Sequence, residues 1–408
     1  MAGPLGHLVP GLTIASGRVI IVVGLSADGV LADPDAVAAA SVVIGSRRHL
    51  GLLPKSPTQR RIPLPTPLRP GLAALVEEHG DVVVLASGDP LMSGIGATLI
   101  DMYGAGRVDI RPAVSSVALA RARMGWPAET SAVVSVVGRD VSLVRRELAP
   151  GRRILVLSSD EHTPHQVAAL LTEAGYGRSR LTVLGDLGTP ACQSTDVTAD
   201  ACAGAFPRLN IVAVEVVGGS AGIGWVAGLP DEAFEHDGQL TKRDLRACAL
   251  ARLAPVPGER LWDVGAGAGS VGIEWMRAHP TCTATAVEAD PERAARISRN
   301  AARLGVPTLA VVTGRAPDAL AGLPAPDAVF VGGGATRAGV LDSCLAALRP
   351  GGRLVVHGVT LETESLLARL QAEHGGELSR ISVERVHAIG TFRGWAPART
   401  VTQWALTR

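Results

Sequence analysis

One glycine-rich segment of the sequence has the residue types and spacing of a cofactor-binding turn. It runs from Leu261 to Glu274 and reads LWDVGAGAGSVGIE, an apolar strand followed by alternating glycines. Glycine lets the backbone turn tightly and approach a ligand, and a helix beginning at Ser270 would present free N–H donors. The residues predicted to hold a nucleotide-like cofactor in this turn are Asp263, Gly265, Ala266, Gly267, Ala268 and Gly269.

A second carboxylate follows at the end of the next predicted strand, in the segment AVEAD. Glu288 is placed there to accept hydrogen bonds from both hydroxyls of a ribose. The spacing leaves two cofactors open, because Gly267, Gly269 and Gly272 also satisfy the dinucleotide fingerprint with Glu288 about 20 residues further on. Asp263 directly before the turn favours S-adenosylmethionine and a methyltransferase. A nicotinamide-dependent reductase is the alternative, and a turn without a ligand is the third interpretation.

The first half of the chain carries three weaker signals, each at the end of a predicted strand. They read VVGLSADG over residues 22–29, ASGDPLMSGIG over 86–96 and PAVSS over 112–116. In α/β proteins the loops at the carboxyl ends of parallel strands form the binding site. Ser115 and Ser116 open a predicted helix, so helix capping competes with ligand contact as the reason for their hydroxyls.

The elements that must position these residues follow an α/β pattern. Short β-branched runs alternate with helical patterns, which predicts largely parallel sheets. The strands expected in the first half cover residues 18–24, 41–45, 81–86, 107–111, 132–137, 153–158, 181–185 and 210–216. The segment 54–70 contains six prolines and is predicted to be a loop.

Domain boundaries are expected around the segment GGSAGIGWVAGLP, which is rich in glycine and poor in charge, as linkers often are. We expect one domain over residues 18–217, a linker over 218–235 and a second domain over 236–408. In the second domain a helix is expected over 241–253. Its strands are expected over residues 260–264, 283–287, 309–313, 327–331 and 353–357. The two halves share no internal repeat, which favours two unrelated domains.

Length and composition agree with two folded domains. The 408 residues exceed the roughly 150 of a typical single domain, and 47% hydrophobic with 19% charged residues indicates a globular enzyme. A net charge of +1 and only 3% aromatic residues argue against nucleic-acid or membrane binding. Of the 39 basic residues only Lys55 and Lys242 are lysine, which leaves 37 arginines. An anionic substrate would therefore be held mostly by guanidinium groups.

The five cysteines form no C-x-x-C pair and no Cys/His cluster with zinc spacing, so we expect reduced thiols and no metal. The apolar runs are far shorter than the roughly 18–20 residues that span a bilayer. Residues 1–17 look like a short extension without the charged start and apolar core of a signal peptide. A cytoplasmic location is expected.

The order of the motifs resembles that of two known families. VVGLSADG, SGDPLMSGIG and AVSSV, followed by VVGRD and LNIVAVE, resemble the tetrapyrrole methylase family, whose members methylate precorrins from S-adenosylmethionine. LPDEAFEHDGQLTKRDLRA leading into LWDVGAGAGSVGIEW resembles the precorrin decarboxylase-type methyltransferase domain. The joined order is similar to bifunctional precorrin methyltransferases of cobalamin biosynthesis. The resemblance implies a two-lobed N-terminal fold, a Rossmann-like C-terminal fold and one S-adenosylmethionine in each domain.

The resemblance also implies roles for individual residues. The cofactor contacts that it implies in the first domain, in a cleft between the two lobes, are Leu25, Asp89, Met92, Ser115 and Ser116. In the second domain the glycine turn would be joined by Thr241, Glu288 and Ala316. The first turn, Gly24 to Gly29, lacks the middle glycine of a G-x-G-x-G loop.

The activity implied by the resemblance is methylation of a precorrin. The first domain would methylate carbon 5, and the second would methylate carbon 15 and remove the ring C acetate carboxyl. The cobalt-loaded precorrin of the anaerobic pathway is the alternative substrate, and a cofactor-sensing protein with one inactive domain is the non-enzymatic alternative. Both domain families are usually oligomeric, so a homo-oligomer is expected.

Substrate contacts are expected at further strand ends. Arg139, Arg315 and Arg337 are candidate clamps for carboxylates, with a solvated surface role as the alternative. Gly333, within three successive glycines, suggests close approach of a flat ligand, although a flexible turn explains it as well. His357 could donate to a carboxylate or shuttle a proton, and a core histidine is the competing interpretation. Methyl transfer from a sulfonium needs alignment more than a base, so no catalytic residue is assigned.

Overall fold

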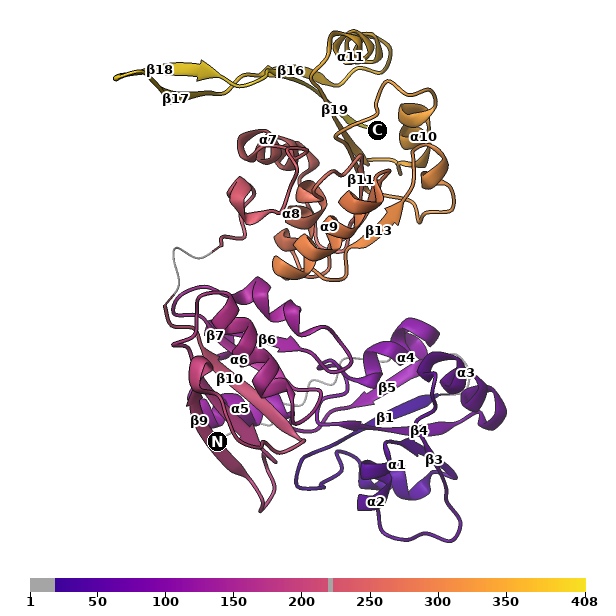
Figure 1. The fold of residues 1–408 in the computed structure, drawn as a ribbon. Coiled ribbons are helices and arrows are strands. Elements are labelled where there is room, and N and C mark those ends of the chain that lie inside the picture. The colour runs from indigo at the N-terminus through magenta and orange to yellow at the C-terminus, as the bar shows by residue number, and fades with distance from the viewer. Residues whose placement is uncertain (1–18, 219–222) are drawn as a thin grey trace, which may run out of the picture. The chain divides into compact units, whose positions relative to one another are not determined.

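The computed structural model describes residues 19–218 and 223–408, which form two compact units (Figure 1). Of the described residues, the first unit comprises 19–139, 152–169 and 177–215, and the second comprises 140–151, 170–176, 216–218 and 223–408. The predicted extension 1–17, residue 18 of the first predicted strand and residues 219–222 of the predicted linker lie outside the described residues. In the described ranges, no helix is long and apolar enough to cross a membrane.

The first unit begins with a five-stranded parallel sheet of order β3-β2-β4-β1-β5. Its strands are β1 (Ile20–Leu25), β2 (Val42–Gly45), β3 (Arg60–Pro63), β4 (Val82–Ser87) and β5 (Val108–Arg111). The helices between them are α1 (Pro34–Ala39), α2 (Arg47–Leu52), α3 (Leu68–His79) and α4 (Ile95–Tyr103). Successive residues of β1 and β4 join hydrophobic clusters on opposite faces, one with α3 and α4 and one with α1 and α2. Burial on both faces explains why these strands read as continuous apolar runs.

The second sheet of the first unit has the order β6-β7-β10-β8-β9 and is parallel only between β6 and β7. Its strands are β6 (Ser131–Ser135), β7 (Arg153–Leu157), β8 (Arg180–Gly185), β9 (Gln193–Thr198) and β10 (Asn210–Glu215), and its helices are α5 (Ser116–Met124) and α6 (Thr163–Glu173). Val117 of α5 packs with Leu155 and Ile211 of the sheet. The two-lobed architecture is therefore present.

Two strands of the first unit differ from the sequence prediction. Residues 60–63 were expected in a loop, and this expectation is wrong, because they form β3 at the edge of the parallel sheet. Proline is tolerated at such an edge, where one side of the strand needs no hydrogen bonds. The polar strand β9 at the edge of the second sheet was not predicted.

The second unit is built on a seven-stranded sheet of order β13-β12-β11-β14-β15-β19-β16. The strands are β11 (Arg260–Val264), β12 (Thr283–Glu288), β13 (Ala310–Thr313), β14 (Ala328–Val331), β15 (Arg353–Gly358), β16 (Glu377–Ile381) and β19 (Val401–Thr407). The first five strands of that order are parallel, and β19 runs antiparallel between β15 and β16. The strand order reverses between β11 and β14, and α/β sheets bind ligands at the carboxyl ends of strands at such a switch point.

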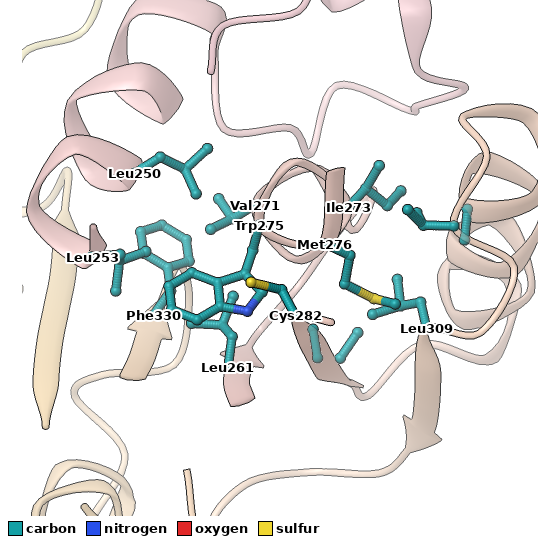
Figure 2. Close-up of a cluster of buried hydrophobic side chains, with 14 of the residues drawn as sticks. Leu250, Leu253, Leu261, Val271, Ile273, Trp275, Met276, Cys282, Leu309 and Phe330 are labelled. Atoms are coloured by element: carbon teal, nitrogen blue, oxygen red, sulfur yellow. The ribbon is translucent and has the colours of Figure 1, made fainter. Parts of the chain in front are cut away.

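Helices cover both faces of this sheet and close its core. One face packs against α7 (Arg243–Leu253), α8 (Ser270–Ala278) and α9 (Pro291–Arg303), and the other against α10 (Val340–Ala347) and α11 (Leu361–His374). Figure 2 shows Trp275, which is 0% exposed, among Leu253, Leu261 and Phe330. The parallel strands predicted for this half are confirmed, with ends that differ by one residue at most.

A buried ion pair fixes the end of the predicted linker to this core. Arg246, which is 0% exposed, donates from Nε to Oε1 of Glu274 at 2.5 Å. The Glu274 carboxylate also accepts the amides of Gly228 at 2.6 Å and Leu229 at 2.9 Å. Residues 228 and 229 therefore pack as part of the second unit.

The hairpin of β17 (Glu384–Ile389) and β18 (Phe392–Pro397) was not predicted. Its strands pair with each other and join no larger sheet in the part of the chain that the structure describes. Figure 1 shows it extending away from the rest of the second unit. Every residue of β17 is exposed, including Val386 and Ile389.

Candidate functional site

Three loops of the first unit meet at the carboxyl ends of β1, β4 and β5. The amide of Gly88 donates to the carbonyl of Leu25 at 2.8 Å, and the amide of Ala113 donates to the carbonyl of Gly88 at 3.1 Å. A Cβ on Gly24 would lie 2.1 Å from the Gly88 carbonyl oxygen. A Cβ on Gly88 would lie 2.6 Å from Cα of Ser115. Only glycine at these two positions allows the three loops to approach so closely.

The five residues predicted to contact the cofactor in the first unit lie on these loops. Leu25 is buried, and its carbonyl is already bonded to the β4 loop. Asp89 accepts the amide of Leu91 at 2.8 Å, and Met92 is exposed. Ser115 caps α5 by accepting the amide of Ala118 at 3.2 Å, and Ser116 is the first residue of that helix. The capping interpretation of Ser115 is thus confirmed, and contact of these five residues with a cofactor stays a prediction.

A polar cluster beside these loops was missed by the sequence analysis. His49 is 5% exposed, and its Nε2 lies 2.9 Å from Oγ of Ser87, the last residue of β4. Arg48 donates from Nη2 to the same Oγ at 3.2 Å and lies 2.8 Å from Nε2 of His49. Burial, followed by the charge of Arg48, lowers the pKa of His49 to about 4, so the imidazole is neutral near pH 7.

In the second unit the predicted glycine turn joins β11 to α8 at the switch point of the sheet. Gly265, Gly267 and Gly269 all have positive φ, which strains other residues. A Cβ on Gly265 would lie 2.8 Å from the carbonyl oxygen of Gly333, in the loop after β14. Gly265 and Gly333, two of the predicted site residues, therefore lie side by side. Ala266 and Ala268 occupy the positions between the three glycines.

Two carboxylates accept backbone amides of this turn and of the helix that follows it. Glu288, at the end of β12, accepts the amide of Gly267 at 2.8 Å and that of Asp290 at 3.0 Å. Asp263 is 1% exposed and accepts the amide of Gly272 at 2.9 Å. Burial raises the pKa of Asp263 to about 7, the Gly272 bond opposes this shift, and the charge of Glu288 adds to it.

Thr241 and Ala316 reach the same edge of the sheet through their loops. A Cβ on Gly267 would lie 2.8 Å from the carbonyl oxygen of Gln239, so the segment that carries Thr241 lies against the turn. The loop after β13, which carries Ala316, is bonded to β12 where Gly314 donates to the carbonyl of Glu288 at 2.9 Å. Their contact with a cofactor remains a prediction.

The predicted substrate residues fall into two groups. Arg139, Arg315 and Arg337 are exposed, and the structure gives none of them an ion-pair partner among the described residues. His357 is 9% exposed and bonded through Nε2 to Oε1 of Gln403 at 2.9 Å, and burial lowers its pKa. His357 is therefore held in the sheet, which matches the competing interpretation of a core histidine.

The residues present fit S-adenosylmethionine in both units. Each site contains a backbone cradle, formed by Gly24 and Gly88 in the first unit and by Gly265 and Gly267 in the second. At these glycines a Cβ would collide with a neighbouring loop. Each oxygen of Glu288 accepts one amide and retains a further lone pair for a ribose hydroxyl. Among residues 19–218 and 223–408, no three His, Cys, Asp or Glu side chains gather as they would around a metal ion.

Two family models match separate stretches of the chain, and the expected domain bounds 18–217, 218–235 and 236–408 stay a prediction. Residues 34–202 match the family described as Tetrapyrrole (Corrin/Porphyrin) Methylases, and residues 232–408 match the Precorrin methyltransferase domain. Both resemblances drawn from the motifs are therefore confirmed, and the second unit matches a methyltransferase family. Binding of the cofactor by the glycine turn stays a prediction.

Named relatives extend over both halves. A precorrin-6Y C(5,15)-methyltransferase [decarboxylating] of Sinorhizobium sp is 46% identical over 397 residues, 95% of this chain and 96% of that protein. The protein of the same name from Mycobacterium tuberculosis is 44% identical over 95% of this chain and 100% of its own length. The C-terminal domain of precorrin-6Y C5,15-methyltransferase from Rhodobacter capsulatus is 45% identical over 45% of this chain and 100% of that structure, with a TM-score of 0.43. The chain belongs to the family of decarboxylating precorrin-6Y C(5,15)-methyltransferases.

Proposed function

We propose that this chain methylates precorrin-6Y at carbons 5 and 15 and removes the ring C acetate carboxyl as carbon dioxide, a step of cobalamin biosynthesis. The observation that carries the proposal is the pair of differently built glycine cradles, one in each unit, in a chain whose relatives over 95% of its length bear that name. Two methyl transfers consume two molecules of S-adenosylmethionine, which bind either at two sites or one after the other at a single site. Two cradles favour the first arrangement.

The reaction requires the protein mainly to align the methyl donor with the precorrin. S-adenosylmethionine supplies an electrophilic methyl group on a sulfonium, and the electron-rich carbons of the precorrin are the nucleophiles. Holding two reactants in line can supply roughly 7–11 kcal/mol of the barrier, so an obligatory base is not needed. In decarboxylation the conjugated macrocycle of the substrate can accept the electron pair. The protein contributes binding, orientation and exclusion of water.

The decisive assay incubates the full chain with S-adenosylmethionine and metal-free precorrin-6Y. Mass spectrometry should find two added methyl groups and one lost carboxyl, and carbon dioxide should be released. Transfer of no methyl group would reject the proposal. Turnover of only the cobalt-loaded substrate would assign the chain to the cobalt-precorrin reaction instead.

We further propose one S-adenosylmethionine site in each unit. Calorimetric titration with S-adenosylhomocysteine should give two sites per chain. Asp89→Ala should remove the first and Glu288→Ala the second, because these carboxylates hold the loops of the two cradles. Asp35→Ala and Glu373→Ala, on exposed residues outside both cradles, are the matched controls. A single site in the wild-type chain would refute this count.

The exposed arginines Arg139, Arg315 and Arg337 remain proposed clamps for the carboxylates of the substrate. The cytoplasm remains the proposed location, and the five cysteines, all free of disulfides, are consistent with a reducing compartment.

We also propose that the chain forms a homo-oligomer through the β17–β18 hairpin. Val386, Ile389, Phe392 and Trp395 are 50%, 62%, 78% and 69% exposed on it. A two-stranded hairpin is marginally stable by itself, and an exposed apolar surface of this kind indicates an interaction site. Light scattering should therefore find more than one chain per particle. The double substitution of Phe392 and Trp395 by serine should reduce this number, whereas a monomeric wild type would refute the proposal.

A further inference from the structure

The first unit contains a groove next to its cofactor cradle that neither the motifs nor the cofactor explain. It measures about 940 Å³, within the size range of small-molecule sites. Its lining comes from the end of β2 and the start of α2 on one side and from the second sheet on the other. The lining residues are Ser46, Arg48, Asp186, Gln193, Ala205, Phe206, Pro207, Arg208 and Leu209. Apolar residues 205–207 and 209 give it a surface suited to a flat hydrophobic ring.

Arg48 brings an unpaired cation to this groove. Its Nη2 is held by Oγ of Ser87 at 3.2 Å and faces Nε2 of His49 at 2.8 Å. No carboxylate of the described residues forms an ion pair with Arg48, whereas Arg111, at the end of β5, pairs with Asp109. A guanidinium has five N–H donors, so most of those of Arg48 remain available for a bidentate carboxylate.

His49 and Ser87 fix the direction of this side chain. Arginine only donates, so the Nε2 of His49 that faces it must be unprotonated. The depressed pKa of His49, caused by burial and then by the charge of Arg48, agrees with this arrangement. Ser87 is the residue before Gly88, on which the three cofactor loops meet. An anion bound to Arg48 would therefore lie next to the predicted position of the methyl donor.

The charges around the groove favour an anionic ligand. Arg48 and Arg208 contribute two positive charges to the lining, and Asp186 contributes one negative charge. We propose that Arg48, oriented by Ser87 and His49, binds a carboxylate of the tetrapyrrole substrate and so sets its position for methylation by the first unit. This inference rests on the proposed function, and it makes Arg48 a substrate-binding residue and Ser87 and His49 positioning residues.

The test compares steady-state methylation of carbon 5 by the full chain and by Arg48→Ala. Losing a charge-assisted hydrogen bond should raise KM for precorrin-6Y by about 10- to 100-fold, while S-adenosylhomocysteine still binds the first unit. Arg48→Lys should show a smaller rise in KM than Arg48→Ala, because lysine keeps the positive charge but lacks the paired N–H donors of a guanidinium. Ser87→Ala should raise KM by less than Arg48→Ala does. Arg47→Ala, an exposed neighbour outside the groove, is the control and should behave like the wild type.

Several outcomes would overturn the inference. A KM for Arg48→Ala equal to that of Arg47→Ala would do so, and so would a loss confined to kcat. Should Arg48→Ala fail to fold, Arg48→Lys decides by the same measurement. A wild type that transfers no methyl group refutes the proposed function separately. The carboxylate site is then tested by fluorescence titration with uroporphyrin III, a tetrapyrrole polycarboxylate, and equal affinity for Arg48→Lys and Arg47→Ala, or no binding at all, would reject it.

Discussion

Replacing Asp263 by asparagine should stabilise the second unit at neutral and alkaline pH. One oxygen of this buried carboxyl accepts the amide of Gly272, and the other has no hydrogen-bond partner among the described residues. Burial and the charge of Glu288 both disfavour the ionised form, which raises the pKa of Asp263 to about 7. Asparagine keeps an oxygen for Gly272 and has no charge to bury.

The size of the effect follows from linkage. Below the ordinary pKa of 3.8 the carboxyl is neutral in both the folded and the unfolded chain, so its ionisation does not lower the free energy of unfolding. Between 3.8 and about 7 the unfolded chain releases the proton and the folded unit keeps it, so the free energy of unfolding falls as pH rises. At about 1.4 kcal/mol per pH unit the loss reaches about 4 kcal/mol above pH 7 and then stays constant.

Urea unfolding of the full chain at several pH values would measure this cost. Trp262, Trp275 and Trp404 are buried in the second unit, so in a Trp126→Phe background their fluorescence reports its unfolding. The advantage of Asp263→Asn over the parent should grow by about 2 kcal/mol between about pH 5.5 and pH 7, and then level off.

Glu288→Gln provides a second check on this interpretation. It removes the charge that helps to raise the pKa of Asp263, so the pH dependence of stability should become weaker. A difference between Asp263→Asn and the parent that stays constant across the pH range would refute the reasoning.

Two further substitutions test the packing that positions the sites. Gly24→Ala places a Cβ 2.1 Å from the carbonyl oxygen of Gly88, and it should lower the free energy of unfolding by about 1–3 kcal/mol and abolish S-adenosylhomocysteine binding to the first unit in calorimetry. Gly51→Ala, where a Cβ meets no atom of the described residues within 4 Å, is its control and should leave S-adenosylhomocysteine binding unchanged. Because Gly51 lies in α2 and alanine is the better helix former, this change should raise the free energy of unfolding by up to about 1 kcal/mol. Arg246→Leu leaves Glu274 buried without its partner and should destabilise the second unit by about 3–5 kcal/mol in urea unfolding. A change below about 1 kcal/mol would contradict the structural role of this ion pair.

How far the fold could be predicted depended on burial. β1, β4 and β11 are covered on both faces, and their continuous apolar runs were recognised within one or two residues. β3 and β9 lie at sheet edges, carry proline or polar side chains, and were missed. The exposed hairpin and the edge strand β16 were missed for a related reason, because they lack a strong apolar pattern. The strand β19 is buried between β15 and β16, but its buried run VTQW includes two polar residues.

The candidate sites could be predicted only where their residues are close together in the sequence. The turn of the second unit is local, so Asp263 and its glycines could be recognised from a few consecutive residues. The cluster of Arg48, His49 and Ser87 joins residues 38 positions apart. It depends on β2 lying beside β4, which no spacing in the sequence reveals.

The missing middle glycine of the first turn has a structural explanation. In the second unit one turn supplies three glycines with positive φ in five residues. In the first unit the close approach is divided among loops, because Gly24 faces the carbonyl of Gly88 and Gly88 faces Ser115. Both units require the same thing: the backbone must pass so close to a neighbouring segment that a Cβ would collide with it. Glycines on separate loops can satisfy this requirement as well as glycines in one loop. A search for a single G-x-G-x-G turn therefore finds the second cradle and overlooks the first.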